Sequence, residues 1–236
     1  MNRPSFIRRS ALRIIAPLLK GWYAWWNGKE RRVHVDGFDL TIPPGVFHPD
    51  LFLSTRLLAE HVGDLSLAGK TFLDLGTGSG RIALTASRAG AIATACDVNP
   101  AAVECVRQNA QRNKFPLTAV LSDQFASLPD HFDFIAINPP YYDRDPSTPA
   151  EHAFLAGAGH RYFVRLFPAL AVRIRNGSEV LMVLSEDLDL ERILGIATLN
   201  GLVSRPVRRA KRWGEATTVF HVVQASADAR SNATGS

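Results

Sequence analysis

From Thr71 onward the sequence alternates between short apolar runs and longer segments with helical periodicity. This alternation restricts the fold more than any other feature. Strands are expected at 71–75, 91–96, 117–121, 132–137 and 179–185, and helices near 80–89, 100–113, 158–174 and 188–199. Strands separated by helices pair in parallel, with helices on both faces of the sheet. Two further apolar runs, 202–207 and 217–223, have no helix between them. The sequence therefore predicts an α/β fold with a seven-stranded, mostly parallel sheet and an antiparallel end strand.

The chain is expected to divide into four parts. They are a basic amphipathic arm (1–32), a β-hairpin with a lead-in segment (33–56), an α/β domain (57–224) and a disordered tail (225–236). Asp36-Gly37 joins two short apolar runs, and such a two-residue link is a strong hairpin signal. A helix is expected to follow over 53–62, with Ser54 or Asp50 as its N-cap.

Positive charge is concentrated in the arm. It holds eight Lys and Arg residues against Glu30, so it contributes +7 to a chain whose net charge is +5. Its apolar face, which includes Trp22 and Trp25, favours packing on the main domain. The alternatives are contact with a polyanion such as RNA, or with a membrane surface. A second basic cluster lies at 205–212.

Composition excludes several other classes of protein. Two cysteines, Cys96 and Cys105, are too few for a disulfide framework. No apolar run approaches the roughly 20 residues that a membrane-spanning helix needs. No metal site is expected either. A cytoplasmic protein is therefore the prediction.

A glycine-rich loop follows the first strand of the alternating region. Gly76, Gly78 and Gly80 allow a sharp turn and a close approach of the backbone to a ligand. A dinucleotide-binding loop needs a further glycine where Arg81 stands. The spacing Asp-x-Gly-x-Gly-x-Gly instead favours S-adenosylmethionine. The carboxylate of Asp74 would accept a hydrogen bond from the ammonium group of this ligand. Thr77 lies within the same candidate site.

Acidic and polar residues also end the next two strands. Asp97 lies about twenty residues past the glycine loop, where a carboxylate is expected to accept from ribose hydroxyls. Val98 follows it in the candidate cofactor site, while Asn99 is the better helix cap. Asp123 or Gln124, after the third strand, is a candidate partner of the adenine amino group.

The fourth strand ends at Asn138-Pro139-Pro140-Tyr141. Two prolines cannot continue a central strand. The side-chain carbonyl of Asn138 and the backbone carbonyl of Pro139 would accept from a planar nitrogen and orient it for methyl transfer. Pro140 would stiffen the loop, and Tyr141, with Tyr142 beside it, would stack on the substrate.

The chain resembles class I S-adenosylmethionine-dependent methyltransferases of the small methyltransferase domain group, which share a Rossmann-like fold. The resemblance covers residues 44–223 and rests on GVFHPDLFLSTRLLAEHV, FLDLGTGSGRIAL, CDVNPAAVECVRQNAQRN, FDFIAINPPYY and WGEATTVFHVV. It implies catalytic roles for Asn138, Pro139, Pro140 and Tyr141, and a cofactor site built from Asp74, Gly76, Gly78, Gly80, Asp97 and Asp123.

The resemblance implies methylation of a nitrogen but leaves the substrate open. The leading expectation is a glutamine of a protein such as a release factor, as in HemK-type enzymes. The alternatives are N6-adenine of rRNA or tRNA, and a small-molecule amine. A protein that binds S-adenosylmethionine and RNA without catalysis is the non-enzyme alternative.

Overall fold

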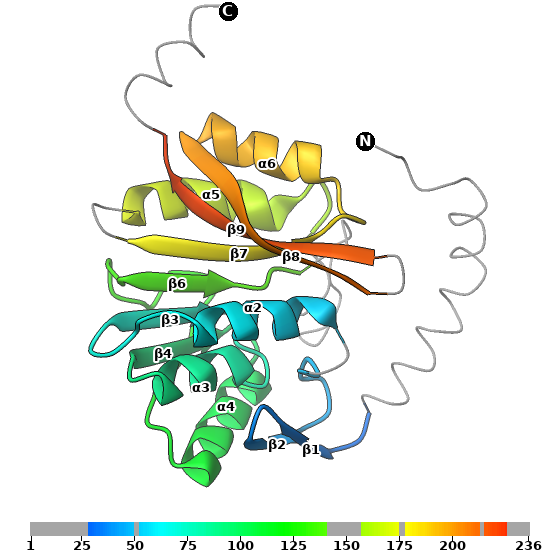
Figure 1. Cartoon of the computed structure of the whole chain (residues 1–236), viewed down its shortest axis with the longest axis vertical. Helices are drawn as coiled ribbons and strands as arrows, with labels where there is room; N and C mark the ends of the chain where they lie inside the picture. Colours follow the sequence, from blue (N-terminus) through cyan, green and yellow to red (C-terminus); the bar gives the residue numbers. More distant parts are fainter. Residues whose placement is uncertain (1–27, 50–51, 141–156, 175–177, 213–214, 226–236) are drawn as a thin grey trace, which may run out of the picture.

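The computed structural model confirms the predicted architecture. It describes residues 28–49, 52–140, 157–174, 178–212 and 215–225. The strands of the large sheet are β3 (Thr71–Leu75), β4 (Ile92–Asp97), β5 (Thr118–Leu121), β6 (Phe134–Ile137), β7 (Glu179–Ser185), β8 (Leu202–Arg212) and β9 (Glu215–Gln224). They lie in the order β5-β4-β3-β6-β7-β9-β8 (Figure 1). The five strands from β5 to β7 are parallel, and β9 is antiparallel to both of its neighbours.

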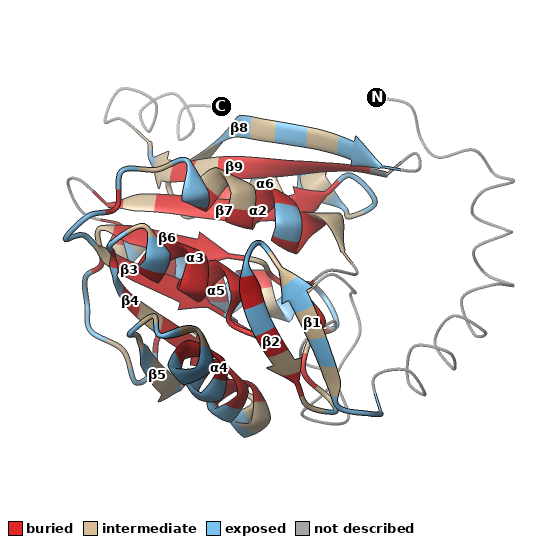
Figure 2. Cartoon of the chain, turned by 60° about the horizontal axis from the view of Figure 1, so that its bottom comes forward, coloured by how far each residue is buried: buried red, intermediate tan, exposed pale blue. Residues whose placement is uncertain are grey.

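Within the described residues, five helices cover the sheet. They are α2 (Leu53–Gly63), α3 (Arg81–Arg88), α4 (Pro100–Asn113), α5 (Arg161–Arg173) and α6 (Leu190–Leu199). One apolar cluster joins α5 and α6 to side chains such as Leu73, Ile135 and Met182. A second cluster joins α2 and α3 to alternate side chains such as Phe72 and Ala136. Successive strand residues face opposite sides of the sheet, so the two clusters lie on its two faces. Helices therefore cover both faces, and the central strands are buried (Figure 2).

The register of the parallel strands decides which residues meet at the carboxyl edge of the sheet. Leu75 pairs with Cys96 on one side and with Ile137 on the other. The residues that follow these strand ends therefore lie side by side. They include the glycine loop, Asp97 and Asn138. Ligands of open α/β sheets bind beyond this edge.

The predicted hairpin is confirmed as β1 (Arg31–Val35) and β2 (Phe38–Ile42), which pair antiparallel around Asp36-Gly37. Both turn residues have positive φ, 52° for Asp36 and 80° for Gly37. Arg81, which is 2% exposed, fixes this turn to α3. Its Nε donates to the Asp36 carboxylate at 2.7 Å, and its Nη1 donates to the backbone oxygen of Pro49 at 2.8 Å.

Asn109 of α4 ties the hairpin to the glycine loop. Its Oδ1 accepts from the backbone N–H of Thr41 at 2.9 Å, and its Nδ2 donates to the carbonyl of Ser79 at 3.0 Å. The side chain is completely buried, so these bonds satisfy an amide that would otherwise be costly to bury. The glycine loop is therefore held from the side of the hairpin as well as by the sheet.

Some expectations were wrong or fall outside the described residues. Ser54 does not cap α2, because the N-cap position is Phe52, without a side-chain cap bond. Asp50, the other candidate, lies outside the described residues, as do the arm through residue 27 and the tail from residue 226. The expected strand at 202–207 continues to Arg212, past a bulge between Pro206 and Arg208.

Candidate active site

The glycine loop has the backbone geometry that its sequence predicts. Gly76, Gly78 and Gly80 have φ of 80°, 54° and 89°, in the region that glycine adopts without strain. The N–H groups of Gly76 and Thr77 each donate to the carbonyl of Cys96 at 2.9 Å. Phe47, from the lead-in segment, lies over Gly78, where an added Cβ would be 3.3 Å from the Phe47 Cβ. The loop is thus a tight, rigid turn at the carboxyl edge of β3.

Asp74, at the base of the loop, has two carboxylate oxygens in different surroundings. Its Oδ2 accepts from Thr77 Oγ1 at 2.7 Å and from the N–H of Ala83 at 3.1 Å. Its Oδ1 is buried and makes no hydrogen bond with any of the described residues. Burial, with a smaller contribution from the charge of Asp97, raises the pKa of the carboxyl group to about 7, although the bonds from Thr77 and Ala83 oppose the shift. A buried acceptor without a donor fits the ammonium group of an amino-acid ligand.

This raised pKa predicts a pH effect on stability. The unfolded carboxyl loses its proton near pH 3.8 and the folded one near pH 7, so folding is disfavoured progressively as the pH rises between these values. Asp74→Asn should remove this loss, because asparagine stays neutral and can still accept from Thr77 and Ala83. The free energy of unfolding of the variant relative to the parent should rise by on the order of 3 kcal/mol between pH 4 and pH 8.

Urea denaturation of both proteins at several pH values measures this difference. Titrations shared by the two proteins cancel in the comparison. A difference that does not change with pH would show that Asp74 is already ionised in the folded protein.

Asp97 supports the loop from the next strand. Its Oδ2 accepts from the N–H of Gly78 at 3.0 Å, and its Oδ1 accepts from the N–H of Asn99 at 2.9 Å. Asn99 caps α4 as predicted, since its side chain accepts from the N–H of Ala101. Val98 is 41% exposed, an apolar side chain at an edge where a ligand would cover it. The ribose role of Asp97 stays a prediction.

The third strand end contributes polar groups with partners of their own. Asp123 forms an exposed ion pair with Arg165 at 2.7 Å. Gln124 has a φ of 50°, and its Nε2 donates to the backbone carbonyl of Tyr162 at 3.1 Å. The structure brings both residues to the candidate site, and their adenine role stays a prediction.

Tyr162, at the start of α5, was missed by the sequence reasoning. Burial raises the pKa of its hydroxyl group, and the charges of Cys96, Asp97 and Asp123 raise it further. Its backbone carbonyl accepts from Gln124 Nε2, so the start of α5 lies beside the third strand end. No local motif marks it, because an aromatic residue in the first turn of a helix usually serves the core.

Asn138 follows the last residue of β6 and is partly buried. Its Nδ2 donates to Thr55 Oγ1, in the first turn of α2, at 3.0 Å. Pro139 is buried, and Pro140 is partly buried. Thr55 is a second residue that sequence reasoning missed, since 83 positions separate it from Asn138. Tyr141 and Tyr142 lie outside the described residues.

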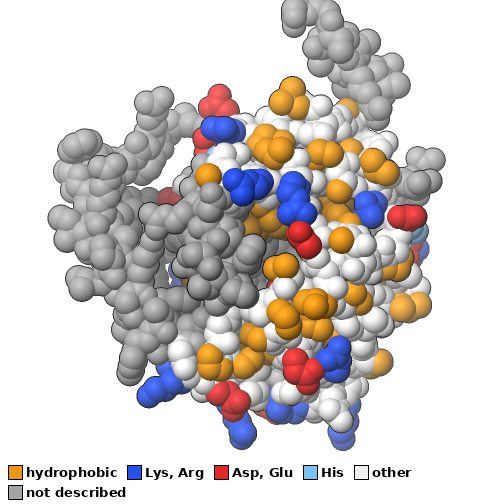
Figure 3. All heavy atoms as spheres, turned by 180° about the vertical axis from the view of Figure 1, so that it is seen from behind, with side chains coloured by type: hydrophobic (Ala, Val, Ile, Leu, Met, Phe, Trp, Pro, Cys, Tyr) orange, Lys and Arg blue, Asp and Glu red, His pale blue; other side chains and the backbone are white. Residues whose placement is uncertain are grey.

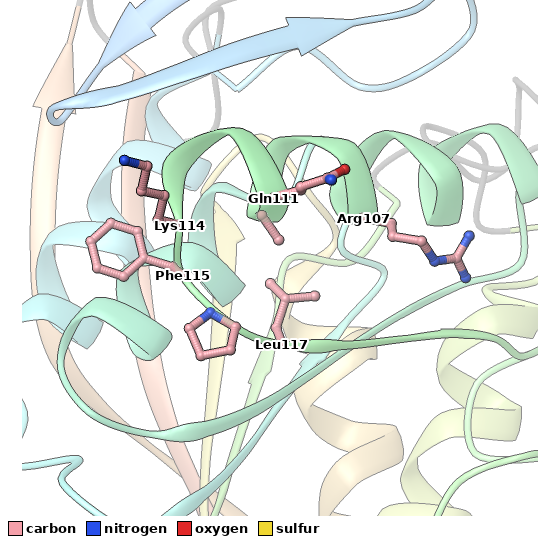
Figure 4. A pocket seen from close by; sticks show the side chains of 7 residues that line it. Arg107, Gln111, Lys114, Phe115 and Leu117 are labelled. Carbon is pink, nitrogen blue, oxygen red and sulfur yellow. The ribbon is translucent and has the colours of Figure 1, made fainter.

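Beyond this site, three further features of the described residues concern function: metal-binding groups, membrane-spanning helices and other hollows. Within them, no group of three His, Cys, Asp or Glu side chains is arranged to hold a metal ion. None of the described helices is both long and apolar enough to cross a membrane. A hollow of about 350 Å³ lies at the amino edge of the sheet, between the end of α4 and the start of β5 (Figure 4). Arg107, Lys114 and Phe115 are among its lining residues.

Comparison with known proteins agrees with the geometry. A family model described as the methyltransferase small domain matches residues 37–199. A Methanocaldococcus jannaschii protein, provisionally named a protein N5-glutamine methyltransferase, is 31% identical over 110 residues, which are 46% of this chain and 54% of that protein. The ribosomal protein L11 methyltransferase of Burkholderia thailandensis is 36% identical over 105 residues, which are 44% of this chain and 34% of that protein. The matched segments thus span about half, or less, of these relatives.

Solved structures share the fold. A 16S rRNA N2 G1207 methyltransferase of T. thermophilus, in complex with AdoMet and guanosine, aligns with a TM-score of 0.60 at 20% identity, over 84% of this chain and 50% of that one. The Mtq2–Trm112 complex of E. cuniculi, responsible for methylation of the eRF1 translation termination factor, aligns with a TM-score of 0.59 at 21% identity. That alignment covers 77% of this chain and 99% of the other.

Proposed function

Because this chain belongs to the methyltransferase small domain family, we propose that it methylates a planar nitrogen, namely the side-chain amide of a glutamine in a protein substrate. The observation that carries the proposal is Asn138. It lies at the carboxyl edge beside the glycine loop, and its amide nitrogen is already bonded to Thr55. An asparagine held in this way can offer its carbonyl oxygen to a second amide.

The residues at the edge fit S-adenosylmethionine as the methyl donor. Oδ1 of Asp74 is a buried acceptor with no partner among the described residues, and is suited to the ammonium group. The glycine loop would face the amino-acid part, and Asp97 with Val98 would face the ribose and adenine. Asp123 or Gln124 would accept from the adenine amino group. When bound, the cofactor supplies an electrophilic methyl group on a sulfonium.

The protein's own contribution is to position the substrate nitrogen. An amide lone pair is delocalised, so this nitrogen is a poor nucleophile and gains most from orientation. The Asn138 carbonyl and the Pro139 backbone carbonyl would accept its two N–H groups, fixing its plane and stabilising the positive charge that develops on it. Tyr141 and Tyr142 are proposed to stack on the substrate.

The ion pairs of basic side chains on β8 favour a glutamine over a nucleic-acid base as the substrate. Arg208 is paired with Glu60 and Asp64, and Arg209 with Glu186. On the face seen in Figure 3, basic and acidic side chains are also interspersed. Binding to nucleic-acid phosphates requires a cluster of Lys and Arg side chains that are not already neutralised by acidic residues. The second candidate, a base of rRNA or tRNA, rests on Arg205 and Lys211, for which the described residues provide no ion pair.

Transfer of a tritiated methyl group distinguishes these substrates. Purified protein is incubated with labelled cofactor and with total protein, total RNA or small amines from cells that lack its gene. We expect label in protein that survives ribonuclease, and a 14-dalton increase on a glutamine by mass spectrometry. Label in RNA alone would support the second candidate. Cofactor binding without transfer to any fraction would leave only a binding function.

A further inference from the structure

The two ends of the Asn138 side chain are nearly equal in size but opposite in hydrogen bonding. The carbonyl oxygen accepts, and the NH2 group donates. For the proposed reaction the oxygen must face the substrate, because the substrate amide brings N–H groups. A rotation of the side-chain amide by half a turn would present a donor to a donor. Something in the fold must therefore distinguish the two ends.

Thr55 provides this distinction. Its Oγ1 accepts from Asn138 Nδ2 at 3.0 Å, and its side chain is buried, with 6% of the residue exposed. With the nitrogen end held on this side, the carbonyl oxygen is directed away from Thr55. The bond is partly buried, so solvent competes for it less than it would at the surface.

The threonine is itself held firmly. It lies in the first turn of α2, and the following turns bury Leu57, Leu58 and Val62 against β3, β6 and β7. A threonine in a helix has two main χ1 rotamers, and burial holds this one in the rotamer whose Oγ1 meets Asn138. Helix α2 thus connects the face of the sheet to the end of β6.

We propose that Thr55 is a positioning residue, which fixes the side-chain amide of Asn138 with its carbonyl oxygen toward the substrate nitrogen. This inference rests on the proposed function, since it assigns Thr55 a part in the same transfer. It adds a residue from outside the glycine loop and the Asn-Pro-Pro-Tyr stretch. Thr55 would act through Asn138, without touching the substrate.

Thr55→Val tests the proposal, because valine keeps the shape of threonine and removes the acceptor. We expect kcat for methyl transfer to fall about tenfold, the usual effect of losing one positioning hydrogen bond. The affinity for S-adenosylmethionine, measured by calorimetry, should stay unchanged. Thr55→Ser keeps the hydroxyl group and should retain most of the activity.

The neighbouring residue offers a matched control. Ser54 is also buried, and its hydroxyl group makes no hydrogen bond with the described residues. Ser54→Ala therefore removes a hydroxyl group from the same helical turn without touching Asn138, and kcat should not change. If Ser54→Ala slows transfer as much as Thr55→Val, the effect comes from the packing of α2, and the proposal is wrong.

A second readout does not depend on activity. The side-chain NH2 signals of Asn138 can be assigned by NMR as the pair that disappears in Asn138→Ala. These signals should shift in Thr55→Val and stay in place in Thr55→Ser and Ser54→Ala. Signals that do not move in Thr55→Val would overturn the proposed bond.

The possible failures can be told apart. If the parent protein methylates none of the fractions, or if Asn138→Ala keeps full activity, the proposed function fails. If the parent is active and Asn138→Ala is not, but Thr55→Val matches Thr55→Ser in kcat, the function stands and the role of Thr55 is refuted.

Discussion

Asn138→Ala should lower the rate of methyl transfer by about a thousandfold, an effect in the range found when a preorganised hydrogen-bonding group is removed from an active site. Alanine leaves the substrate nitrogen without one of its two proposed acceptors, so the nitrogen is no longer aligned with the methyl group. Single-turnover transfer to the identified substrate measures the loss. Cofactor affinity, measured by calorimetry, should change little, because the glycine loop and Asp97 do not depend on the Asn138 side chain.

Asn200→Ala is a suitable control for this experiment. Asn200 is the C-cap of α6, and its Nδ2 donates to the carbonyl of Ile196, away from the carboxyl edge of the sheet. Its loss should affect stability slightly and transfer not at all. Transfer by Asn138→Ala within a few fold of the parent would show that another group orients the nitrogen.

Gly80→Ala should be the most damaging single substitution in the glycine loop for stability. An added Cβ would lie 2.4 Å from Cγ2 of Val106, on α4, in a backbone conformation with φ of 89°. Overpacking and backbone strain each carry a penalty of about 1–3 kcal/mol. We therefore expect the free energy of unfolding, measured by urea denaturation, to fall by about 3 kcal/mol.

Gly76→Ala separates the two causes. Gly76 has a similar φ of 80°, but an added Cβ there meets nothing within 4 Å. This variant should show the backbone strain alone and lose roughly half as much stability. Equal losses in the two variants would mean that Val106 moves aside without a penalty.

The secondary structure was largely predictable because its signals are local. The expected bounds of β3, β7 and α4 match the structure, since apolar runs and the Asn99-Pro100 cap mark their ends clearly. The length of strand β8 was underestimated, because a proline followed by several arginines is more typical of a loop. A bulge between Pro206 and Arg208 absorbs the proline, and pairing with β9 continues beyond it.

The candidate site was predictable only where its residues lie at the end of a strand or directly after it. Asp74, Asp97 and Asn138 could be placed together because parallel strands end at a common edge. Thr55 and Tyr162 could not, since each reaches the site from a helix whose packing no local pattern defines. In the sequence, Arg81 was informative only because it occupies the position where a dinucleotide-binding loop has a glycine. The structure shows why an arginine stands there, as it binds the hairpin turn and the carbonyl of Pro49.

The two edges of the sheet bear on how the protein behaves at high concentration. A sheet edge exposes unpaired N–H and C=O groups, and long flat edges invite pairing with another molecule. One edge here, β5, has four residues, while the other, β8, has eleven and is interrupted by Pro206 and the adjoining bulge. The exposed Arg205, Lys211 and Arg212 add mutual repulsion between two such edges. The basic strand would thus protect the folded protein from edge-to-edge aggregation, whatever its substrate.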